Sequence, residues 1–526
     1  MRSEEKAWGR ETIRDLYDAA LERRSSAVFL RHFDGSGWSM FTYGASRDRV
    51  LKTLAVLLDQ GLTAASDGGF RQRVAIMREN GPEWIFAYLA LAGCGFVVVP
   101  VDPHLRSSEA SHILLDSGAA VLLADDRLKE VVEATGVRMA CLYAGELAER
   151  TEAVSAEALR RAESFWAAHR PQADDVASVV YTSGTTGRPK GAMLTHGNFS
   201  ANVEQTLARV KFVAEDHHLI VLPLFHVFAF TLSFMIPLKT GAQISFARTM
   251  RAVPVDMAEL KPSVFMAVPL LAELLYDRAP QIVSTLRVLG VGGAPISRGT
   301  LDCLRAAGVF VLEGYGITEC APGVSYPDEH RYVPGTVGCP LDGMEWRITE
   351  SDETGAGELR VKGPNVMKGY WNNPSETAKA FDADGFYRTG DIVRPVLNGN
   401  FTICGRTKAL IVNREGKNIY PEEIERTIRR CPFVADVVVV GYRVGGETGE
   451  HVGAIVVPNQ EAVAEALGSL TNEAKAGEIR RAVQAICHEE LAEYKLPRKI
   501  DVRFAALERT SSMKVRRFIY ARALDE

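Results

Sequence analysis

The feature of this chain that most constrains its fold is an alternation of strand-like and helical hydrophobic patterns over most of its length. Residues 73–77 have the apolar character of a buried strand, residues 82–92 have the pattern of a helix, and residues 96–100 are again strand-like. A second helix at 107–116 leads to a further strand at 121–124. This alternation predicts βαβ units with largely parallel sheets, and therefore the α/β fold class.

A chain of 526 residues is too long for a single hydrophobic core, so two or more domains are expected. The βαβ pattern changes at about 337–401, where short strands between Gly and Asp turns predict a barrel-like β subdomain. We place the boundary in a polar segment, which gives a large N-terminal domain of residues 1–406 and a smaller α+β domain of residues 407–526. The C-terminal domain is expected to contain helices and strands at 421–430, 436–440, 452–457 and 473–494.

Composition excludes several classes of protein. An apolar content of 47% and a charged content of 24% are ordinary for a soluble globular protein, and a net charge of −5 gives no nucleic-acid signal. The polar start of the chain is unlike a secretory signal. The eight cysteines never form a Cys-x-x-Cys pair, which favours reduced thiols in a cytoplasmic protein without zinc or disulfides.

Two long uncharged stretches, at 85–101 and 219–238, have the length of membrane spans. Turn-forming residues interrupt both of them, including Pro100 in the first and Pro223, His226 and Pro237 in the second. We therefore interpret both stretches as buried core and expect no transmembrane segment.

Residues 181–191, with the sequence Tyr-Thr-Ser-Gly-Thr-Thr-Gly-Arg-Pro-Lys-Gly, have the composition of a loop that holds phosphate groups. They contain three glycines, four Ser or Thr hydroxyls and Lys190. Glycines let backbone N–H groups approach an anion, hydroxyls add donors, and lysine adds a positive charge. The loop is not a Walker A motif, because Pro189 precedes Lys190 and Gly191 follows it.

The residues around this loop predict a hairpin rather than a strand-to-helix turn. A buried strand is expected to end at 176–180, a second short strand to follow at 192–195, and a helix to begin after Asn198 as its cap.

Three other segments carry residues that suit a nucleotide. Gly292 and its small neighbours allow a flat ring to approach closely. In the sequence Glu-Gly-Tyr-Gly-Ile-Thr-Glu at 313–319, Tyr315 can stack on a base and Glu319 offers a hard oxygen ligand for Mg²⁺. In Tyr-Arg-Thr-Gly-Asp, the ionised Asp391 can accept hydrogen bonds from two hydroxyls.

In their order and spacing, these motifs resemble those of the adenylate-forming (AMP-binding) superfamily, which includes acyl-CoA synthetases, carrier-domain adenylation modules and firefly-type luciferases. The segments at 405–408 and 508–517 resemble two further motifs of that family, although Met513 stands where the family usually has glycine. The resemblance covers residues 41–518 and is greatest to bacterial fatty-acid–CoA ligases. It implies that the C-terminal domain is mobile and carries a catalytic lysine, Lys514.

The resemblance also implies roles for individual residues. Catalytic roles fall to Lys514, Thr318, Glu319 and His226, although His226 alone, in an apolar run, is typical of a core histidine. Glu319 is the implied Mg²⁺ ligand, and Lys408 is the implied hinge, followed by Ala409 where an acidic residue is common. The residues implied to bind ATP are Thr182, Ser183, Gly184, Thr185, Thr186, Gly187, Lys190, Gly293, Ala294, Pro295, Glu313, Gly314, Tyr315, Gly316, Thr318, Asp391, Ile403 and Arg406.

The implied reaction uses ATP, Mg²⁺ and coenzyme A to convert a carboxylic acid, through an acyl-adenylate, into an acyl-CoA. A medium- or long-chain fatty acid is the expected substrate, because residues 222–238 and 405–425 most resemble those of bacterial ligases for such acids. The candidate pocket residues are apolar or small, with no cation evident for a dicarboxylate or an amino acid; they are Phe225, Phe230, Phe234, Gly292, Gly314 and Ala321. The alternatives are an aryl acid, transfer to an acyl carrier protein, and a non-catalytic acyl-nucleotide-binding protein. No nucleic-acid partner is expected, peripheral membrane contact stays open, and the expected location is the cytoplasm.

Overall fold

The structure is a computed structural model that describes residues 7–63, 66–67, 70–182, 188–278, 285–293, 296–328, 331–414, 417–444, 449–509, 515 and 517–525. The chain divides into two compact units. Unit 1 comprises Met1–Arg347, Arg360–Arg388 and Val396–Phe401, and unit 2 comprises Ile348–Leu359, Thr389–Pro395 and Thr402–Glu526. Each unit is described below by itself.

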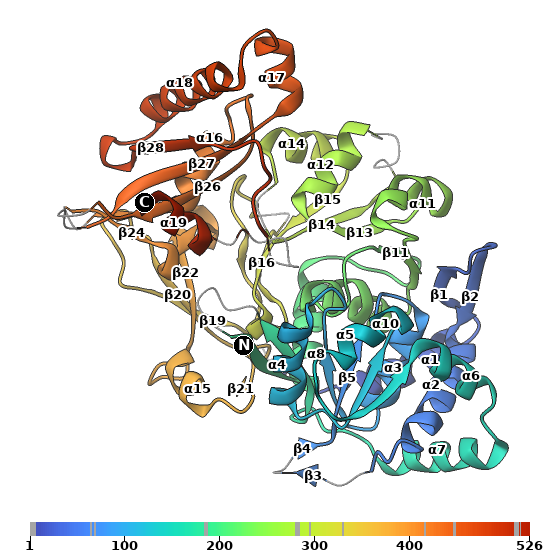
Figure 1. The fold of residues 1–526 in the computed structure, drawn as a ribbon. Helices are drawn as coiled ribbons and strands as arrows, with labels where there is room; N and C mark the ends of the chain where they lie inside the picture. Colours follow the sequence, from blue (N-terminus) through green and yellow to red (C-terminus); the bar gives the residue numbers. More distant parts are fainter. Residues whose placement is uncertain are drawn as a thin grey trace. The chain divides into compact units, whose positions relative to one another are not determined.

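The first large sheet of unit 1 has seven described strands, parallel except for an antiparallel strand at one edge (Figure 1). In spatial order they are β15 (Phe310–Glu313), β14 (Val288–Val291), β13 (Val264–Ala267), β11 (His217–Ile220), β12 (Gln243–Phe246), β1 (Val28–Phe33) and β2 (Trp38–Thr42). Apolar residues of three helices pack against β13, β14 and β15: α11 (Val253–Leu260), α12 (Pro269–Arg278) and α14 (Arg298–Ala306).

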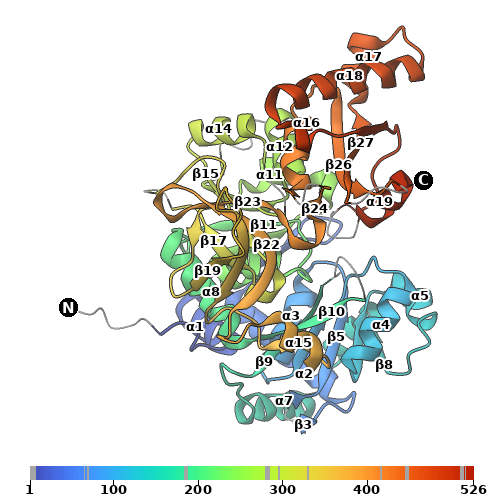
Figure 2. The same ribbon diagram turned by 90° about the vertical axis from the view of Figure 1, so that its left-hand side faces the viewer.

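The second large sheet of unit 1 also has seven described strands, and five of them are parallel. In order they are β21 (Gly369–Tyr370), β10 (Lys190–Thr195), β9 (Val176–Thr182), β6 (Val97–Pro100), β5 (Arg73–Met77), β7 (Val121–Ala124) and β8 (Ala140–Tyr143). Helix α4 (Ser107–Ser117) covers part of this sheet, as Figure 2 shows, through Ala110, Ile113 and Leu114. The largely parallel sheets confirm the predicted α/β class.

The remaining helices of unit 1 are α1 (Ile13–Arg24), α2 (Tyr43–Leu58), α3 (Pro82–Ala92), α5 (Lys129–Glu133), α6 (Ala144–Glu152), α7 (Ala156–Ala168), α8 (His196–Arg209), α9 (Val227–Ala229), α10 (Ile236–Thr240) and α15 (Pro374–Ala380). Helix α3 is apolar and buried along its length except at Glu83, as expected for a helix in the core, and Pro82 lies in its first turn. It has the bounds that its sequence predicted. No helix within the described ranges is long and apolar enough to cross a membrane.

Short strands make up the region at 337–401 that was predicted as barrel-like, and two more short strands precede it. They form a three-stranded sheet of β16 (Tyr315–Gly316), β17 (Gly323–Tyr326) and β18 (Cys339–Pro340), and a four-stranded sheet of β19 (Glu345–Thr349), β20 (Gly357–Lys362), β22 (Tyr387–Pro395) and β23 (Phe401–Arg406). A further small pair joins β3 (Ser66–Asp67) and β4 (Phe70–Arg71).

Unit 2 is built on a three-stranded sheet of β26 (Val434–Tyr442), β27 (His451–Pro458) and β28 (Lys499–Val502), with a small ladder of β24 (Ile411–Val412) and β25 (Asn418–Ile419). Its helices are α16 (Pro421–Ile428), α17 (Gln460–Leu467), α18 (Asn472–Glu490) and α19 (Arg517–Asp525). Residues of α16, α17 and α18 share one apolar cluster with the sheet, and residues of α19 share a second. The α+β organisation follows the sequence expectation, while β28, α17 and α19 were not predicted.

Two local predictions need correction. Asn198 is not the cap of α8: the helix begins at His196 and is capped by Thr195, because the two side chains exchange hydrogen bonds with each other's backbone N–H at 3.0 and 2.9 Å. Pro237 does not break its helix. The π-helical residues Phe230–Met235 lead directly into α10, where Pro237 lies in the first turn and its missing N–H is tolerated.

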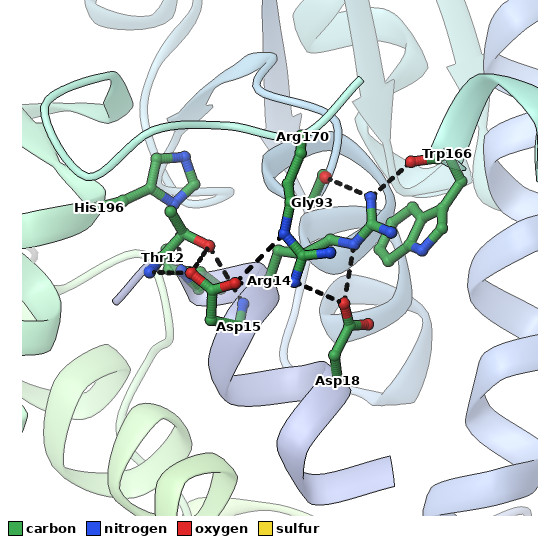
Figure 3. Close-up of polar contacts among 9 residues, drawn as sticks. Thr12, Arg14, Asp15, Asp18, Gly93, Trp166, Arg170 and His196 are labelled. Atoms are coloured by element: carbon green, nitrogen blue, oxygen red, sulfur yellow. Dashed lines mark hydrogen bonds and ion pairs between the residues drawn. The ribbon is translucent and has the colours of Figure 1, made fainter. Parts of the chain in front are cut away.

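The start of α1 is joined to three other elements by a buried polar cluster (Figure 3). The Arg14 guanidinium donates to the carbonyl oxygens of Gly93 at 3.3 Å and Trp166 at 2.5 Å, and pairs with Asp18 at 3.2 Å. Nδ1 of His196 accepts a hydrogen bond from the backbone N–H of Ile13 at 3.2 Å. Complete burial lowers the pKa of His196 to about 4, so its ring is neutral near pH 7.

Candidate active site

Lys190 of the predicted phosphate loop opens the second strand of a β-hairpin. Strands β9 and β10 pair antiparallel, with Lys190 opposite Thr182, which confirms the predicted hairpin. The Lys190 ammonium forms an ion pair with Glu376 and lies 5.2 Å from the centre of the Tyr370 ring. The hydrogen bond from Lys190 lowers the pKa of Glu376 to about 2, so the Glu376 carboxylate is ionised at neutral pH.

Several predicted site residues lie outside the described residues, and their roles stay predictions. They are Ser183, Gly184, Thr185, Thr186, Gly187, Ala294, Pro295 and Lys514. Beside them, Gly293 has a φ of +89°, a conformation that favours glycine.

Glu319 is held by a phenol from a distant part of the chain. It lies with Thr318 in a single 3₁₀ turn, Thr318–Cys320. The Tyr370 hydroxyl donates to Glu319 Oε1 at 2.9 Å, and the Tyr387 hydroxyl lies 3.3 Å from that of Tyr370. Burial, together with the nearby Glu319 charge, raises the pKa of both phenols, so both keep their protons. The Glu319 carboxylate is thus fixed by a neutral donor.

The segment at 313–316, whose Tyr315 was predicted to stack on the base, is tightly packed. A Cβ added to Gly314 would lie 2.3 Å from the Tyr326 ring, so only glycine fits there. Tyr315 is buried, with its ring centre 6.4 Å from that of Phe401. Glu313 is also buried and accepts a hydrogen bond from the backbone N–H of Ile296 at 3.3 Å. These contacts give the segment a defined shape; Gly316, the other glycine beside Tyr315, is exposed.

The aromatic residues predicted to line the acyl pocket do lie together. His226 directly precedes α9, and its ring centre is 4.5 Å from that of Phe225. Phe225 and Phe230 line one small apolar gap together with Tyr88, Pro100, Ser178, Val180, Phe199, Leu224 and Val227. The gap is too narrow for a water molecule, so it would admit an acyl chain only if these side chains moved. Phe234 packs on Phe230 with 5.3 Å between ring centres.

Unit 2 carries the residues predicted to bind the ribose. Asp391, on β22, is only 2% exposed, and its Oδ1 lies 2.9 Å from Nε of Arg406 on β23. The Thr407 hydroxyl donates to the carbonyl oxygen of Gly390 at 3.1 Å. The structure therefore brings the two predicted ribose residues into an ion pair. Of the other two residues predicted in this region, Ile403 lies on β23 and Lys408 in the 3₁₀ turn Thr407–Ala409.

The donor set around Glu319 fits Mg²⁺. This ion binds through one or two carboxylates together with substrate phosphates, rather than in a cage of protein ligands. No cluster of three or more metal-ligating side chains occurs in the part of the chain that the structure describes. The contact with Tyr370 engages Oε1 of Glu319, which orients the carboxylate without cancelling its charge.

Sequence reasoning missed Tyr370 and Glu376, and it assigned no role to Tyr387. Tyr387 is the first residue of a motif that was recognised, so sequence reasoning could have assigned it a role. Tyr370 and Glu376 reach the site only because β21 pairs with β10 and α15 follows at once. A single Tyr or Glu between ordinary residues carries no signal of such pairing.

The family model of the AMP-binding enzyme matches residues 17–371, and that of the AMP-binding enzyme C-terminal domain matches residues 423–514. The chain is 32% identical over 499 residues to a long-chain-fatty-acid–CoA ligase of Salmonella typhimurium, covering 86% of this chain and 85% of that protein. It is 33% identical over 448 residues to a feruloyl-CoA synthase of an Amycolatopsis species, covering 82% of this chain and 86% of that protein.

Among solved structures, ATP-bound MatB from Rhodopseudomonas palustris is similar, with a TM-score of 0.82 and 27% identity over 98% of this chain and 99% of that one. The likeness therefore extends over both units. Because the first family model alone spans more than half of the chain, and relatives above 30% identity match most of it, the chain belongs to the AMP-binding enzyme family that its motifs predicted.

Proposed function

We propose that this protein is an ATP-dependent, AMP-forming acyl-CoA synthetase that activates a medium- or long-chain fatty acid in the cytoplasm. One observation carries the site assignment: Tyr370 contacts both Lys190, the candidate phosphate cation, and Glu319, the candidate Mg²⁺ ligand. A phosphate-binding cation and a metal-binding carboxylate beside one side chain suit adenylation, because its transition state is stabilised mainly by alignment and charge.

In the proposed first step, a carboxylate oxygen of the acid attacks the α-phosphorus of ATP while the bond to pyrophosphate breaks. In the second step, the thiol of CoA loses its proton, its sulfur attacks the acyl carbon, and AMP leaves. Lys190 and Lys514 neutralise phosphate charge, and His226 orients the acid. Mg²⁺, when bound at Glu319, supplies further neutralisation of the phosphates.

Asp391 and Arg406 position the ribose in this scheme. The 407–526 domain presents Lys514 for adenylation and withdraws it for thioester formation, with Lys408 as the hinge. A few hinge dihedrals can absorb such a rotation. Proline at position 408 would fix φ near −65° and so restrict the rotation of the domain. Lys408→Pro is therefore expected to keep pyrophosphate release but to slow thioester formation from isolated acyl-adenylate.

The fatty-acid assignment draws on the aromatic cluster around Phe225 and Phe230, which is apolar and lies beside His226. An aryl acid is the second candidate, because the feruloyl-CoA synthase relative matches over a similar share of the chain. An acyl carrier protein is the alternative thiol acceptor.

The test is a panel of fatty acids from eight to eighteen carbons and of hydroxycinnamic acids, incubated with ATP, Mg²⁺ and CoA. AMP release is measured, with the slowed variant Glu319→Gln and a reaction without enzyme as controls. The proposal expects the greatest kcat/KM for a fatty acid. A preference for hydroxycinnamates would support the second candidate, and no AMP release with any acid would reject both. Replacing CoA by a phosphopantetheine-loaded carrier protein distinguishes the two thiol acceptors.

A further inference from the structure

We propose that Tyr370 is a positioning residue for adenylation, whose hydroxyl fixes the Glu319 carboxylate in the orientation that binds Mg²⁺ and whose ring guides the Lys190 ammonium. This inference rests on the proposed function for its chemistry. Its geometry stands on contacts within unit 1.

The backbone places Tyr370 rigidly between the two groups. Tyr370 pairs with Ala192 where β21 joins β10, two residues after Lys190. Its backbone N–H donates to the Thr377 hydroxyl at 2.9 Å. The same segment also anchors the backbone of Glu319, because the N–H of Met367 donates to the Glu319 carbonyl oxygen at 2.8 Å. Glu319 and Tyr370 are therefore tied together through both backbone and side chain.

The direction of the hydrogen bonds follows from the number of protons. A phenol has one proton, and that of Tyr370 is donated to Glu319 Oε1. In the 3.3 Å contact between the phenols, Tyr387 must therefore be the donor and Tyr370 the acceptor. Both rings are at least nine-tenths buried, at 9% and 5% exposed, so water competes little for these bonds. The result is an ordered chain of neutral donors that ends on the Glu319 carboxylate.

Neutral donors suit a carboxylate that must bind a cation. An arginine in place of Tyr370 would cancel the charge that attracts Mg²⁺, whereas a phenol fixes the oxygen and leaves the charge. On its other side, the Tyr370 ring lies 5.2 Å from the Lys190 ammonium. Because the Lys190 side chain is partly exposed, this cation–π attraction is weak, so the ring can hold the lysine near the site and still release it to a phosphate.

The test uses Tyr370→Phe in the full chain, which removes the hydroxyl and keeps the ring over Lys190. The direct readout is the affinity of the protein for Mn²⁺, which substitutes for Mg²⁺. It is measured by electron paramagnetic resonance on protein saturated with α,β-methylene-ATP. We expect about tenfold weaker Mn²⁺ binding, the lower end of the effect of one hydrogen bond to a charged group. In fatty-acid-dependent ATP–pyrophosphate exchange, the Mg²⁺ concentration for half-maximal rate should rise equally, with the KM for the acid unchanged.

Tyr17→Phe is the matched control. Tyr17 is also fully buried and shares a 2.7 Å hydrogen bond with Ser46, so the change removes a comparable buried hydroxyl elsewhere in unit 1. It should leave Mn²⁺ affinity at the wild-type value. If Tyr370→Phe fails to fold, Tyr387→Phe tests the same series of hydrogen bonds one residue further from Glu319. We expect a twofold to threefold loss in Mn²⁺ affinity, the scale of a long neutral hydrogen bond.

Wild-type Mn²⁺ affinity in a folded Tyr370→Phe protein would overturn the inference, and so would an equal loss in the Tyr17→Phe control. The Mn²⁺ readout needs no turnover. A wild-type protein that activates no carboxylic acid would therefore reject the proposed function alone, while a Mn²⁺ effect of Tyr370→Phe would still stand.

Discussion

Glu319 in unit 1 and Asp391 in unit 2 are both acidic residues with a predicted role in ATP binding, yet they are held in opposite ways. Glu319 accepts from the neutral phenol of Tyr370 at 2.9 Å, whereas Asp391 pairs with the Arg406 guanidinium at 2.9 Å. A carboxylate that must attract a cation cannot also be neutralised by one. A carboxylate that accepts from ribose hydroxyls can share its charge with an arginine and remain ionised. The partners therefore suit the proposed roles, metal binding for Glu319 and ribose binding for Asp391.

The largest expected effect is that of Glu319→Gln, which keeps the shape and the contact with Tyr370 but removes the charge. We expect pyrophosphate release to slow by about 10²–10³-fold, the scale for losing one preorganised charge in a transition state. The Mg²⁺ requirement should also rise. Single-turnover pyrophosphate release measures the first step, and thioester formation from supplied acyl-adenylate should stay near the wild-type rate. A slow second step with an unchanged first step would contradict the role of Glu319.

Asp391→Ala should act on binding rather than on chemistry. Lost hydrogen bonds between ribose hydroxyls and a charged acceptor are worth about 1.5–3 kcal/mol, so the Kd for ATP should rise by roughly 10–100-fold. Titration calorimetry with α,β-methylene-ATP measures this directly. The Mg²⁺ concentration for half-maximal exchange should stay at the wild-type value, and a shift in it would remove the distinction between the two carboxylates.

Acid should destabilise unit 1 below pH 6.5. Burial lowers the pKa of His196 and His217 to about 4, and also lowers that of His218. Between pH 6.5 and 4 these three histidines bind protons in the unfolded state but not in the folded state. Stability therefore falls with falling pH, by up to about 1.4 kcal/mol per pH unit for each ring.

Tryptophan fluorescence isolates this effect, because all six tryptophans of the chain belong to unit 1. Urea midpoints read by fluorescence at pH 7, 6 and 5 should decrease in that order. His196→Asn keeps an acceptor for the Ile13 N–H and should flatten the slope. Midpoints that stay constant or rise toward pH 5 would show that these rings are not neutral in the folded protein.

The smallest expected effect is that of Glu376→Gln. Glu376 pairs with Lys190 and would compete with phosphate for it, but ion pairs that are open to solvent contribute little, and this one is partly exposed. Removing the carboxylate charge should strengthen ATP binding by at most about threefold, in contrast to the loss in Asp391→Ala. Weaker ATP binding by tenfold or more would show that Glu376 holds Lys190 in its productive position.

The part of the fold with strong local signals was predictable from sequence. The apolar run that forms α3 begins after Gly81 and ends at Ala92 with the predicted bounds, and the hairpin of β9 and β10 follows from the composition around Lys190. The start of α8 was missed, because Thr195 and Asn198 are both acceptable caps and only the backbone geometry decides between them.

Contacts between distant segments were not predictable in the same way. Glu319 and Tyr370 are 51 positions apart in sequence and meet through side-chain hydrogen bonding. The ion pair of Lys190 and Glu376 joins positions 186 apart. Motif resemblance identified one member of each pair, because motifs preserve the residue that meets the ligand. The partner that orients it is visible only in three dimensions.

The central claim, that the two carboxylates have separate tasks, is tested most directly by nucleotide discrimination at varied Mg²⁺. The measurement is the kcat/KM ratio of ATP to 2′-deoxyATP in fatty-acid-dependent pyrophosphate exchange, for wild type, Glu319→Gln and Asp391→Ala. We predict that Asp391→Ala loses the preference for ATP at an unchanged Mg²⁺ requirement. Glu319→Gln should keep the preference and need more Mg²⁺. If both variants shift the two quantities alike, the separation of tasks is contradicted.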